Sequence, residues 1–486
     1  MKHIKESHDG IIVVTGQWSV VIRKWMGCLL LAGFISSCSV SKQISKQANN
    51  ILFNDTAIST GHIGISIYEP ATDKYWYNYN ADKYFIPASN TKLFTLYAGM
   101  KYLGDSLTGL AYQNLSDTTI NVSGTGDPTF MHTDFKKQPA LDFLIAQHKT
   151  IYLSGDYNDN ALGYGWAWDD YNDDYMVERN AFPMYGNTIK IGLNGYSNVT
   201  QKASYPNWKI TPKNFINVID SQFVPDYYTI ATIKDSNLAK LKTQSFRINR
   251  ERITNSLHLK QGNSLFNNTE IPFVTNGVRT TVQILKNDFS LNIINGIITN
   301  GSNPNLPNYY RWRKIKSQPS DSLFKPMMHR SDNFFAEQTL LMVSNEYLGY
   351  ISTGKIIDSL LRYDLKDVPQ KPKWVDGSGL SRYNLFTPGS FVYILNKMKN
   401  EFSWERMKNI LATGGTGTLS NYFKTDSGFI YAKTGTLSNN CALSGFLITK
   451  KGKVLIFSIL ANNYITGATP VRKAVEKYLH AIREEY

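Results

Sequence analysis

Hydrophobic and polar residues alternate in short segments near both ends of the chain, which predicts strands there. Residues 62–69 carry isoleucine at every second position, and after a polar turn residues 75–79 alternate again. Three more alternating segments lie near the C-terminus, at 428–433, 442–449 and 454–461. A period of two is typical of a half-buried strand, so these segments predict an antiparallel sheet built from both ends of the chain.

Helical spacing of apolar residues accompanies these strands. It runs over residues 89–103, 333–343, 390–399 and 470–486, and Thr469 is expected to cap the last of these helices. The last helix is predicted to be amphipathic, with five inward residues: Val471, Val475, Tyr478, Leu479 and Ile482. A sheet flanked by the first and last helices, together with a helical lobe, predicts the α+β fold class.

The middle of the chain, from about residue 113 to 311, has a different texture. Asn, Asp, Ser, Thr and Gly are dense there, and turns separate short alternating segments at 188–192, 228–233 and 279–286. We expect strands at these segments. The stretch therefore predicts one or two β-rich domains inserted into the α+β core.

The N-terminus is predicted to be an export signal over residues 1–37. Two basic residues precede an apolar run, 26–35, that is too short to span a bilayer with ease. Small residues then precede Cys38, which resembles a bacterial lipoprotein signal, so we expect Cys38 to be lipidated. The alternative is a signal peptide cleaved nearby, with Cys38 incidental. Residues 38–54, polar for most of their length, are predicted to form a tether.

Size, charge and cysteine content narrow the class of protein. The 486 residues suffice for two or three domains, and the formal net charge of +14 favours anionic lipid or cell-wall polymer nearby. No Lys/Arg run of the length typical of nucleic-acid binding is present, so nucleic acid is not expected as a partner. Of the three cysteines, Cys28 lies in the predicted signal and Cys38 is the expected lipidation site, which leaves Cys441 alone in the folded body and predicts no disulfide there.

The first of three short motifs is Ser89-Asn-Thr-Lys92, at a predicted helix start. A serine hydroxyl needs a base to attack a carbonyl, and a lysine three residues on lies one helical turn away. Lys92 is a base only when its amine is neutral, which requires burial or a neighbouring cation such as Lys433. The alternative is a capping serine with a surface lysine, as we expect for the similar sequences at 39–42 and 352–355.

The second motif is Ser331-Asp-Asn333. Ser331 is predicted to pass a proton between Lys92 and the leaving amine, and the Asn333 amide is suited to hold a substrate carbonyl and N–H. Asp332 is expected to face away and hold the loop. An alternative, compatible with catalysis, is that Ser331 or Asp332 caps the helix that begins at Asn333.

The third motif, Lys433-Thr434-Gly435, lies within an alternating segment and is followed by Thr436. The charge of Lys433 and the hydroxyl of Thr434 suit a terminal carboxylate. Gly435 is expected to let a substrate backbone approach the strand, which then pairs with it as an added edge. The N–H groups of Ser89 and Thr436 are predicted to form the oxyanion hole. The alternative is a surface turn.

In this order the three motifs resemble those of the penicillin-binding D-Ala-D-Ala carboxypeptidases, of the low-molecular-mass class C type (peptidase S13 family). The long gap between Ser89 and Ser331 resembles the branch of that family with domains inserted there. The resemblance covers about residues 55–486. Secondary matches are Gly124-Thr-Gly-Asp-Pro-Thr129, Gly165-Trp-Ala-Trp-Asp-Asp170, Asp376-Gly-Ser-Gly-Leu-Ser381 with Asn384, and Gly415-Thr-Gly-Thr-Leu419. Asp169 or Asp170 is a candidate to reach the cleft from the insert, with a structural Asx turn as the alternative.

The resemblance implies a penicillin-binding, β-lactamase-like transpeptidase fold, an antiparallel sheet flanked by helices with β-rich inserts. It also implies a division of the chain. The catalytic domain is expected at 55–112 and 312–486, inserted domain II at 113–190 and 279–311, and a nested domain III at 191–278.

The implied activity is that of a serine DD-carboxypeptidase. It would remove the terminal D-Ala from peptidoglycan stem peptides through an acyl-enzyme at Ser89, with DD-endopeptidase activity on cross-links. β-Lactams would be covalent inhibitors, and neither a metal nor a cofactor is expected. The expected location is the periplasm or cell envelope, with membrane attachment through lipid on Cys38.

Two alternatives remain at this point: a β-lactamase-like hydrolase, and a lipid-anchored cell-wall-binding module without catalysis. The intact motif residues argue against the second. The eight histidines are scattered along the chain and support neither a zinc site nor a Ser-His-Asp triad.

Overall fold

The computed structural model describes residues 40–155, 157, 159–194, 207–212, 217–220, 247–260, 268–297 and 311–486. The predicted signal segment, Cys38 and the strand predicted at 228–233 lie outside these residues. Within them, no helix is long and apolar enough to cross a bilayer.

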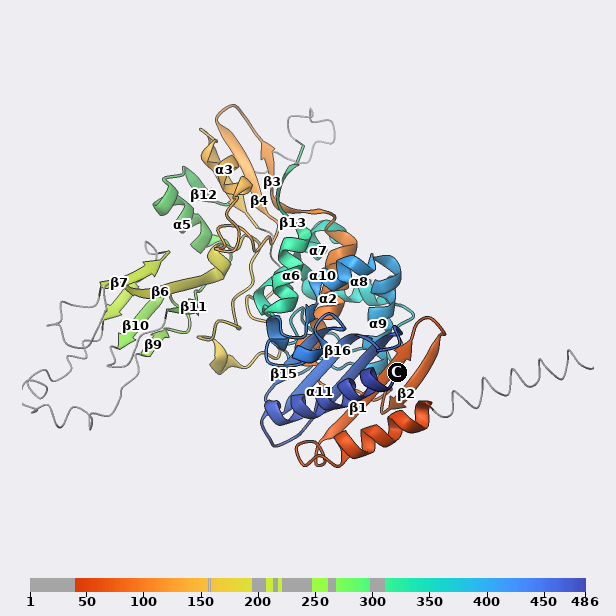
Figure 1. Ribbon diagram of the computed structural model, residues 1–486. Helices are drawn as coiled ribbons and strands as arrows, with labels where there is room; N and C mark the ends of the chain where they lie inside the picture. Colours follow the sequence, from red (N-terminus) through yellow and green to blue (C-terminus); the bar gives the residue numbers. More distant parts are fainter. Residues whose placement is uncertain are drawn as a thin grey trace, which may run out of the picture.

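A six-stranded antiparallel sheet is built from both ends of the chain, as predicted (Figure 1). Its strand order is β14-β15-β16-β17-β1-β2. The predicted hairpin is β1 (His62–Glu69) with β2 (Lys74–Tyr79), and β1 also pairs with β17. The C-terminal strands are β14 (Ala412–Thr413), β15 (Ile430–Leu437), β16 (Asn440–Ile448) and β17 (Val454–Asn462).

Helices cover both faces of this sheet, which confirms the α+β prediction. On one face lies α11 (Ala468–Glu485), and all five of its predicted inward side chains are buried. It begins at Ala468 after Gly467, so Thr469 is inside the helix and is not its cap. The other face packs against a large apolar core. The helices on that side are α2 (Lys92–Tyr102), α6 (Ser320–His329), α7 (Asn333–Leu348), α8 (Thr353–Arg362), α9 (Pro388–Glu401) and α10 (Trp404–Ile410).

The tether predicted over residues 38–54 is wrong where the structure describes it. Residues 40–53 are helical, ending in a π-helical turn, η1 (Asn49–Phe53). Ile44, Ala48 and Leu52 recur every four residues, are fully buried, and join the core between the sheet and α11. Figure 1 shows this helix, in orange-red, lying beside α11 and the sheet. The segment is polar overall because only one narrow stripe of it is buried.

The inserted part contains three further sheets, drawn away from the six-stranded sheet in Figure 1. Their orders are β12-β5-β4-β3-β13, β11-β6-β7 and β8-β10-β9. The strands are β3 (Ser106–Asn114), β4 (Thr119–Gly124), β5 (Thr150–Ser154), β6 (Thr188–Asn194), β7 (Asn207–Thr211), β8 (Asn217–Asp220), β9 (Arg247–Arg250), β10 (Ser256–Lys260), β11 (Thr269–Pro272), β12 (Ile293–Asn295) and β13 (Arg313–Pro319). The helices are α3 (Pro139–Ile145) and α5 (Arg279–Phe289).

Two predictions for the insert need correction. The strand predicted at 279–286 is helix α5, in which Thr281, Ile284 and Leu285 are buried on one face. The predicted domain boundaries at 112 and 312 also miss the sheet edges, because β3 begins at Ser106 and its antiparallel partner β13 ends at Pro319. The strand predicted at 188–192 is confirmed as β6.

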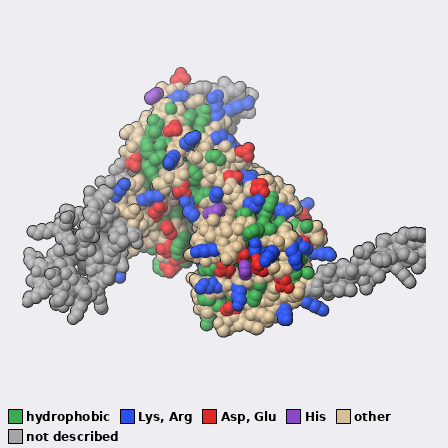
Figure 2. Space-filling view, viewed as in Figure 1, with side chains coloured by type: hydrophobic (Ala, Val, Ile, Leu, Met, Phe, Trp, Pro, Cys, Tyr) green, Lys and Arg blue, Asp and Glu red, His purple; other side chains and the backbone are tan. Residues whose placement is uncertain are grey.

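The surface charge is mixed on the face that Figure 2 shows. Lys and Arg side chains there are interspersed with Asp and Glu side chains, without one continuous basic stripe.

Replacing Leu52 with Ala should lower the free energy of unfolding by about 2–4 kcal/mol, because a fully buried leucine leaves a cavity between the N-terminal helix and the sheet. Denaturant unfolding of the protein measures this. Lys46→Ala, at an exposed position of the same helix, is the matched control and should change stability little. If Leu52→Ala and the control were equally stable, the helix would not be packed on the sheet, and the predicted tether would be supported.

Candidate active site

Ser89 and Lys92 meet at the start of α2. Ser89 lies in a 3-10 turn, η2 (Ala88–Thr91), and α2 begins at Lys92. The Lys92 Nζ donates to Ser89 Oγ at 3.0 Å, and the serine side of the pair stays partly exposed. The predicted nucleophile–base contact is therefore present in the fold.

Lys92 is fully buried and its amine contacts three oxygens. Besides Ser89, Nζ donates to Asn333 Oδ1 at 2.6 Å and to the carbonyl of Ser378 at 2.7 Å. Burial disfavours the ammonium form and lowers the pKa of Lys92 from 10.5 to about 8, although Asp376 and other nearby carboxylates oppose this shift. A lysine with such a pKa is partly neutral near pH 8, as a general base requires.

The Ser331–Asn333 loop adds two polar side chains to the site. The Asp332 side chain accepts from the N–H of Phe335 at 2.9 Å and so caps α7. Ser331 has φ +61°, in the left-handed region, and its Oγ accepts from Lys433 Nζ at 2.8 Å. The structure thus places the Ser331 hydroxyl on Lys433, while Asn333 is the residue of this loop that contacts Lys92.

The Asn333 amide is engaged at both ends. Its oxygen accepts from Lys92, and its Nδ2 donates to the carbonyl of Tyr175, which belongs to the insert, at 2.9 Å. Tyr175 also interacts with Asp170, the last residue of η3 (Trp168–Asp170). A substrate that binds this amide must therefore replace one of these partners.

Lys433 is fully buried on β15, and its Nζ donates to Ser331 Oγ and to the Thr434 carbonyl at 2.6 Å. Burial, with Lys92 and Arg472 as positive neighbours, holds the pKa of Lys433 well below its usual 10.5. The Thr434 hydroxyl donates to Thr418 Oγ1 at 2.8 Å, from η7 (Gly417–Leu419). The segment Gly415–Leu419, one of the secondary sequence matches, thus contacts strand β15 through Thr418.

Gly435 does allow a close backbone approach, but to the protein itself. A Cβ there would lie 2.6 Å from the carbonyl of Pro87, so the glycine lets β15 lie against η2. The Asn90 Nδ2, donating to the Lys433 carbonyl at 3.0 Å, ties the same two segments together. The prediction that Gly435 faces a substrate backbone has no support in this contact.

The edge of β15 is open beyond its first residues. β14 pairs with β15 only at Tyr431 and Ala432 in the described residues, so Lys433–Thr436 have β16 on one side alone. Thr436 is exposed, while Thr434 is largely buried. An extended peptide can add to such an edge by backbone hydrogen bonds.

A buried ionic network that the motif analysis missed lies behind Lys92. Arg179, from the insert, pairs with Glu337 on α7 at 3.1 Å, and both side chains are nearly inaccessible. Glu337 accepts from the N–H of Ser378 at 2.7 Å, and the carbonyl of Ser378 is the third acceptor of Lys92. Burial and Asp376 raise the pKa of Glu337, which Arg179 opposes. One feature of the sequence could have indicated this network: Glu337 is an acidic residue among the apolar residues of a predicted helix.

Asp376 organises the loop that carries Ser378. Its carboxylate accepts from four N–H groups: Gly379 N, Ser381 N, Asn384 Nδ2 and Trp166 Nε1. Gly379 has φ +83°, and a Cβ there would lie 1.9 Å from the Ala88 carbonyl, so only glycine lets this loop reach the Ser89 turn. These residues matched the family pattern in sequence, but their structural roles could not be derived from it.

A serine hydroxyl in contact with a buried lysine amine, beside an open strand edge on an α+β fold, is the arrangement expected of a serine peptidase site of the penicillin-binding class. Residues 44–485 match the D-Ala-D-Ala carboxypeptidase 3 (S13) family, and the chain belongs to that family. It is 24% identical over 435 residues to D-alanyl-D-alanine carboxypeptidase DacB of Haemophilus influenzae, covering 80% of this chain and 83% of that protein. It is 32% identical to carboxypeptidase DacB of Mycolicibacterium smegmatis over 171 residues, 32% of this chain and 37% of the relative.

Solved structures confirm the predicted fold. The crystal structure of penicillin binding protein 4 from Haemophilus influenzae has a TM-score of 0.65 and 21% identity, covering 91% of this chain and 99% of that one. Its complex with a β-lactam has a TM-score of 0.62 and 20% identity over the same shares. The fold is therefore the penicillin-binding, β-lactamase-like one, with the small additional sheets of the insert.

The rate at which a β-lactam acylates Ser89 should rise with pH and level off above about 8. Below that pH Lys92 is protonated and cannot accept the serine proton. Lys92→Met should keep the fold and lower acylation by about 100- to 10,000-fold. Stopped-flow labelling between pH 6 and 10 measures both effects. A wild-type rate that is flat over this range, or normal acylation of Lys92→Met, would contradict the role of Lys92.

Arg179→Gln should lower the free energy of unfolding by about 3–5 kcal/mol, because it leaves the buried Glu337 without its ion-pair partner. Denaturant unfolding of Arg179→Gln, Glu337→Gln and the double variant measures the coupling. Arg406→Gln, which removes a more exposed pair with Asp321, is the control and should cost about 1 kcal/mol or less. If the two arginine variants cost the same, the network does not hold the insert to α7.

Proposed function

We propose that this protein removes the terminal D-Ala from peptidoglycan stem peptides through an acyl-enzyme at Ser89. The observation that carries this proposal is the contact between Ser89 Oγ and a fully buried lysine amine, in a chain whose residues 44–485 match the S13 family. The names of the relatives, D-alanyl-D-alanine carboxypeptidase and carboxypeptidase, support the same substrate class.

Each residue takes a defined part in the proposed reaction. Ser89 Oγ attacks the carbonyl of the penultimate D-Ala while its proton passes to neutral Lys92. The N–H groups of Ser89 and Thr436 hold the oxyanion of the tetrahedral intermediate. As the C–N bond breaks, the proton that Lys92 took from Ser89 passes through the Ser331 hydroxyl to the departing D-Ala amine, which leaves Lys92 neutral again. Water then hydrolyses the ester and restores Ser89.

The contacts of Ser331 support its part in proton return. Its hydroxyl accepts from Lys433, so its own hydrogen is free to be donated towards the leaving amine. The Asn333 amide oxygen accepts from Lys92, and its Nδ2 donates to the Tyr175 carbonyl. Asn333 can bind the peptide once a peptide group replaces one of these two partners. The open edge of β15 supports binding of the stem peptide as an added strand.

DD-endopeptidase activity on cross-links is proposed as a second activity of the same site. A cross-link presents the same D-Ala carbonyl to Ser89, and only the leaving amine differs. The β-lactamase-like alternative needs a carboxylate that activates water. The two buried carboxylates near Lys92 are both committed to structural partners, Glu337 to Arg179 and Asp376 to four N–H donors. Slow deacylation of a β-lactam adduct follows.

Export and lipid attachment at Cys38 are also proposed. The described part of the packed N-terminal helix starts at residue 40, two positions after Cys38 in the sequence. A lipid on Cys38 would therefore hold the helix, and the sheet beneath it, close to a membrane surface rather than on a long tether.

The wild-type protein should release D-Ala from a peptide ending in D-Ala-D-Ala, and a fluorescent penicillin should label Ser89 and block this release. Ser89→Ala should lose both properties because it lacks the nucleophile. Mass spectrometry locates the label, and an assay of free D-Ala measures turnover. Rapid loss of the label would favour a β-lactamase, and absence of D-Ala release with intact labelling would contradict the carboxypeptidase.

A further inference from the structure

Ser331 has a backbone conformation that a serine rarely adopts, so its surroundings must hold it there. Its φ of +61° lies in the left-handed region, where any residue other than glycine is strained. It stands between α6, which ends at His329, and α7, which begins at Asn333. The two residues next to it, Arg330 and Asp332, carry opposite charges. The position of the Ser331 hydroxyl therefore depends on how these two neighbours are held.

The Arg330 guanidinium contacts carboxylates from two parts of the chain. Its Nη2 lies 2.5 Å from Asp134 Oδ2, in the insert, and 3.6 Å from Asp332 Oδ2. The other oxygen of Asp332 caps α7 by accepting from Phe335 N, and the guanidinium lies over the Phe335 ring, 5.6 Å from its centroid. Arg330 thus ties the residue on each side of Ser331 to the insert and to the start of α7.

Stability alone does not account for the pair of Arg330 with Asp134. The two side chains are 48% and 33% exposed, and ion pairs in such settings contribute little to the free energy of unfolding because water already solvates both charges. The insert is held to α7 independently by the buried pair of Arg179 with Glu337. What the exposed pair does fix is the backbone next to a serine of the site.

We propose that Arg330 is a positioning residue: through its two ion pairs it holds the Ser331 hydroxyl where it can pass a proton to the leaving amine. This rests on the proposed function, in which Ser331 gives its proton to the departing D-Ala as the C–N bond breaks and takes one from the Lys92 ammonium. Lys433 already donates to Ser331 Oγ at 2.8 Å, which fixes one side of the hydroxyl. A group displaced by about 1 Å from its productive position can lose about 100-fold in rate.

The test compares two substrates that form the same acyl-enzyme and differ in the leaving atom: a peptide ending in D-Ala-D-Ala, and its thioester in which D-thiolactate replaces the last D-Ala. An amine must be protonated to leave, whereas a thiolate leaves without a proton. The measured quantity is kcat/KM, which covers the steps up to the acyl-enzyme. Arg330→Gln should lower it by about 10- to 100-fold on the peptide and leave it nearly unchanged on the thioester. Arg330→Lys should recover part of the loss, since it keeps the charge but not the planar fork of donors.

Ser331→Ala tests whether Arg330 acts through the serine. This variant should also lose activity selectively on the peptide, because it lacks the hydroxyl. The double variant Arg330→Gln/Ser331→Ala should be no slower on the peptide than Ser331→Ala alone, since no hydroxyl is left to position. Two residues that act independently would instead multiply their losses.

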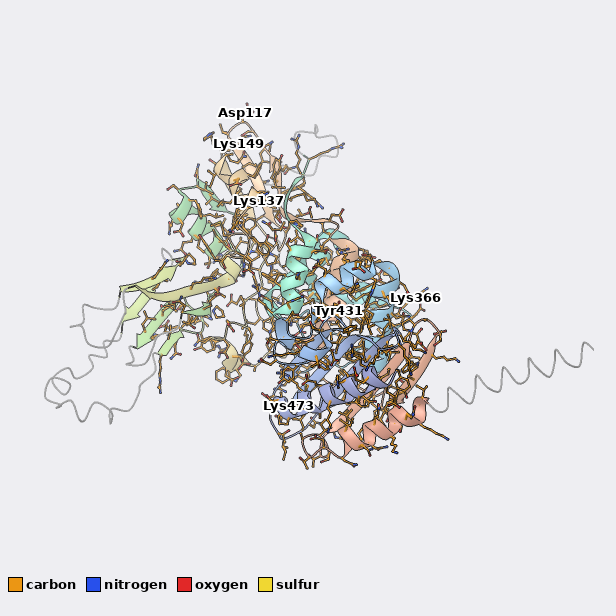
Figure 3. All side chains as sticks on the ribbon, viewed as in Figure 1. Asp117, Lys137, Lys149, Lys366, Tyr431 and Lys473 are labelled. Carbon is orange, nitrogen blue, oxygen red and sulfur yellow. The ribbon has the colours of Figure 1, made fainter. Side chains whose placement is uncertain are left out.

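Two single variants are matched controls. Lys137, labelled in Figure 3, lies three residues after Asp134, is exposed, and loses the same charge in Lys137→Gln. Arg406 pairs with Asp321 at the opposite end of α6 from Arg330, so Arg406→Gln removes a comparable ion pair from the same helix. Both variants should behave as the wild type on both substrates.

Three results would overturn the inference: an equal loss on both substrates in Arg330→Gln, no loss on either, or losses that multiply in the double variant. The first would make Arg330 structural, the second would mean that Ser331 is placed without it, and the third that it does not act through Ser331. Equal losses on both substrates in Ser331→Ala would remove the proton role and the inference with it. Failure of the proposed function is seen separately, as absence of D-Ala release by a wild type that turns over the thioester.

Discussion

The complete burial of two lysines in one site is the constraint on which the rest of the structure depends. Neither Lys92 nor Lys433 has an acid in direct contact among the described residues, and each amine is held by neutral oxygens. Burying an ammonium group without a paired acid is costly, so the fold favours the neutral amine. Because burial favours the neutral amine of Lys92, this amine can accept the proton of Ser89.

Three segments that are distant in sequence must meet for this burial to occur. Gly435 lets β15 lie against the Ser89 turn, and Gly379 lets the Asp376 loop close over it from another side. The insert also contributes, because Arg179 neutralises Glu337 and the Tyr175 carbonyl orients Asn333. The insert is therefore part of the structure that positions the site, as well as a surface beside it.

Much of this arrangement could be predicted from local pattern and motif. The central strands and the flanking helices followed from period and spacing, and the motif residues do converge. Errors arose where the deciding contact is remote: Ile44, Ala48 and Leu52 reveal a buried stripe only against α11, and the apolar residues of 279–286 fit a strand as well as a helix. Which lysine contacts which hydroxyl, and the pairing of Arg330 with Asp134, depend on tertiary geometry and had no sequence signal.

The most direct test of the account is the titration of Lys92 itself. Carbon-13 NMR of protein labelled at lysine Cε follows each amine with pH, and the signal that Lys92→Met removes identifies this residue. If Lys92 is the base, its amine should titrate with a midpoint near 8 in the free enzyme. A midpoint near the ordinary value of 10.5 would mean that Lys92 stays protonated at neutral pH, and would contradict its role as the base that activates Ser89.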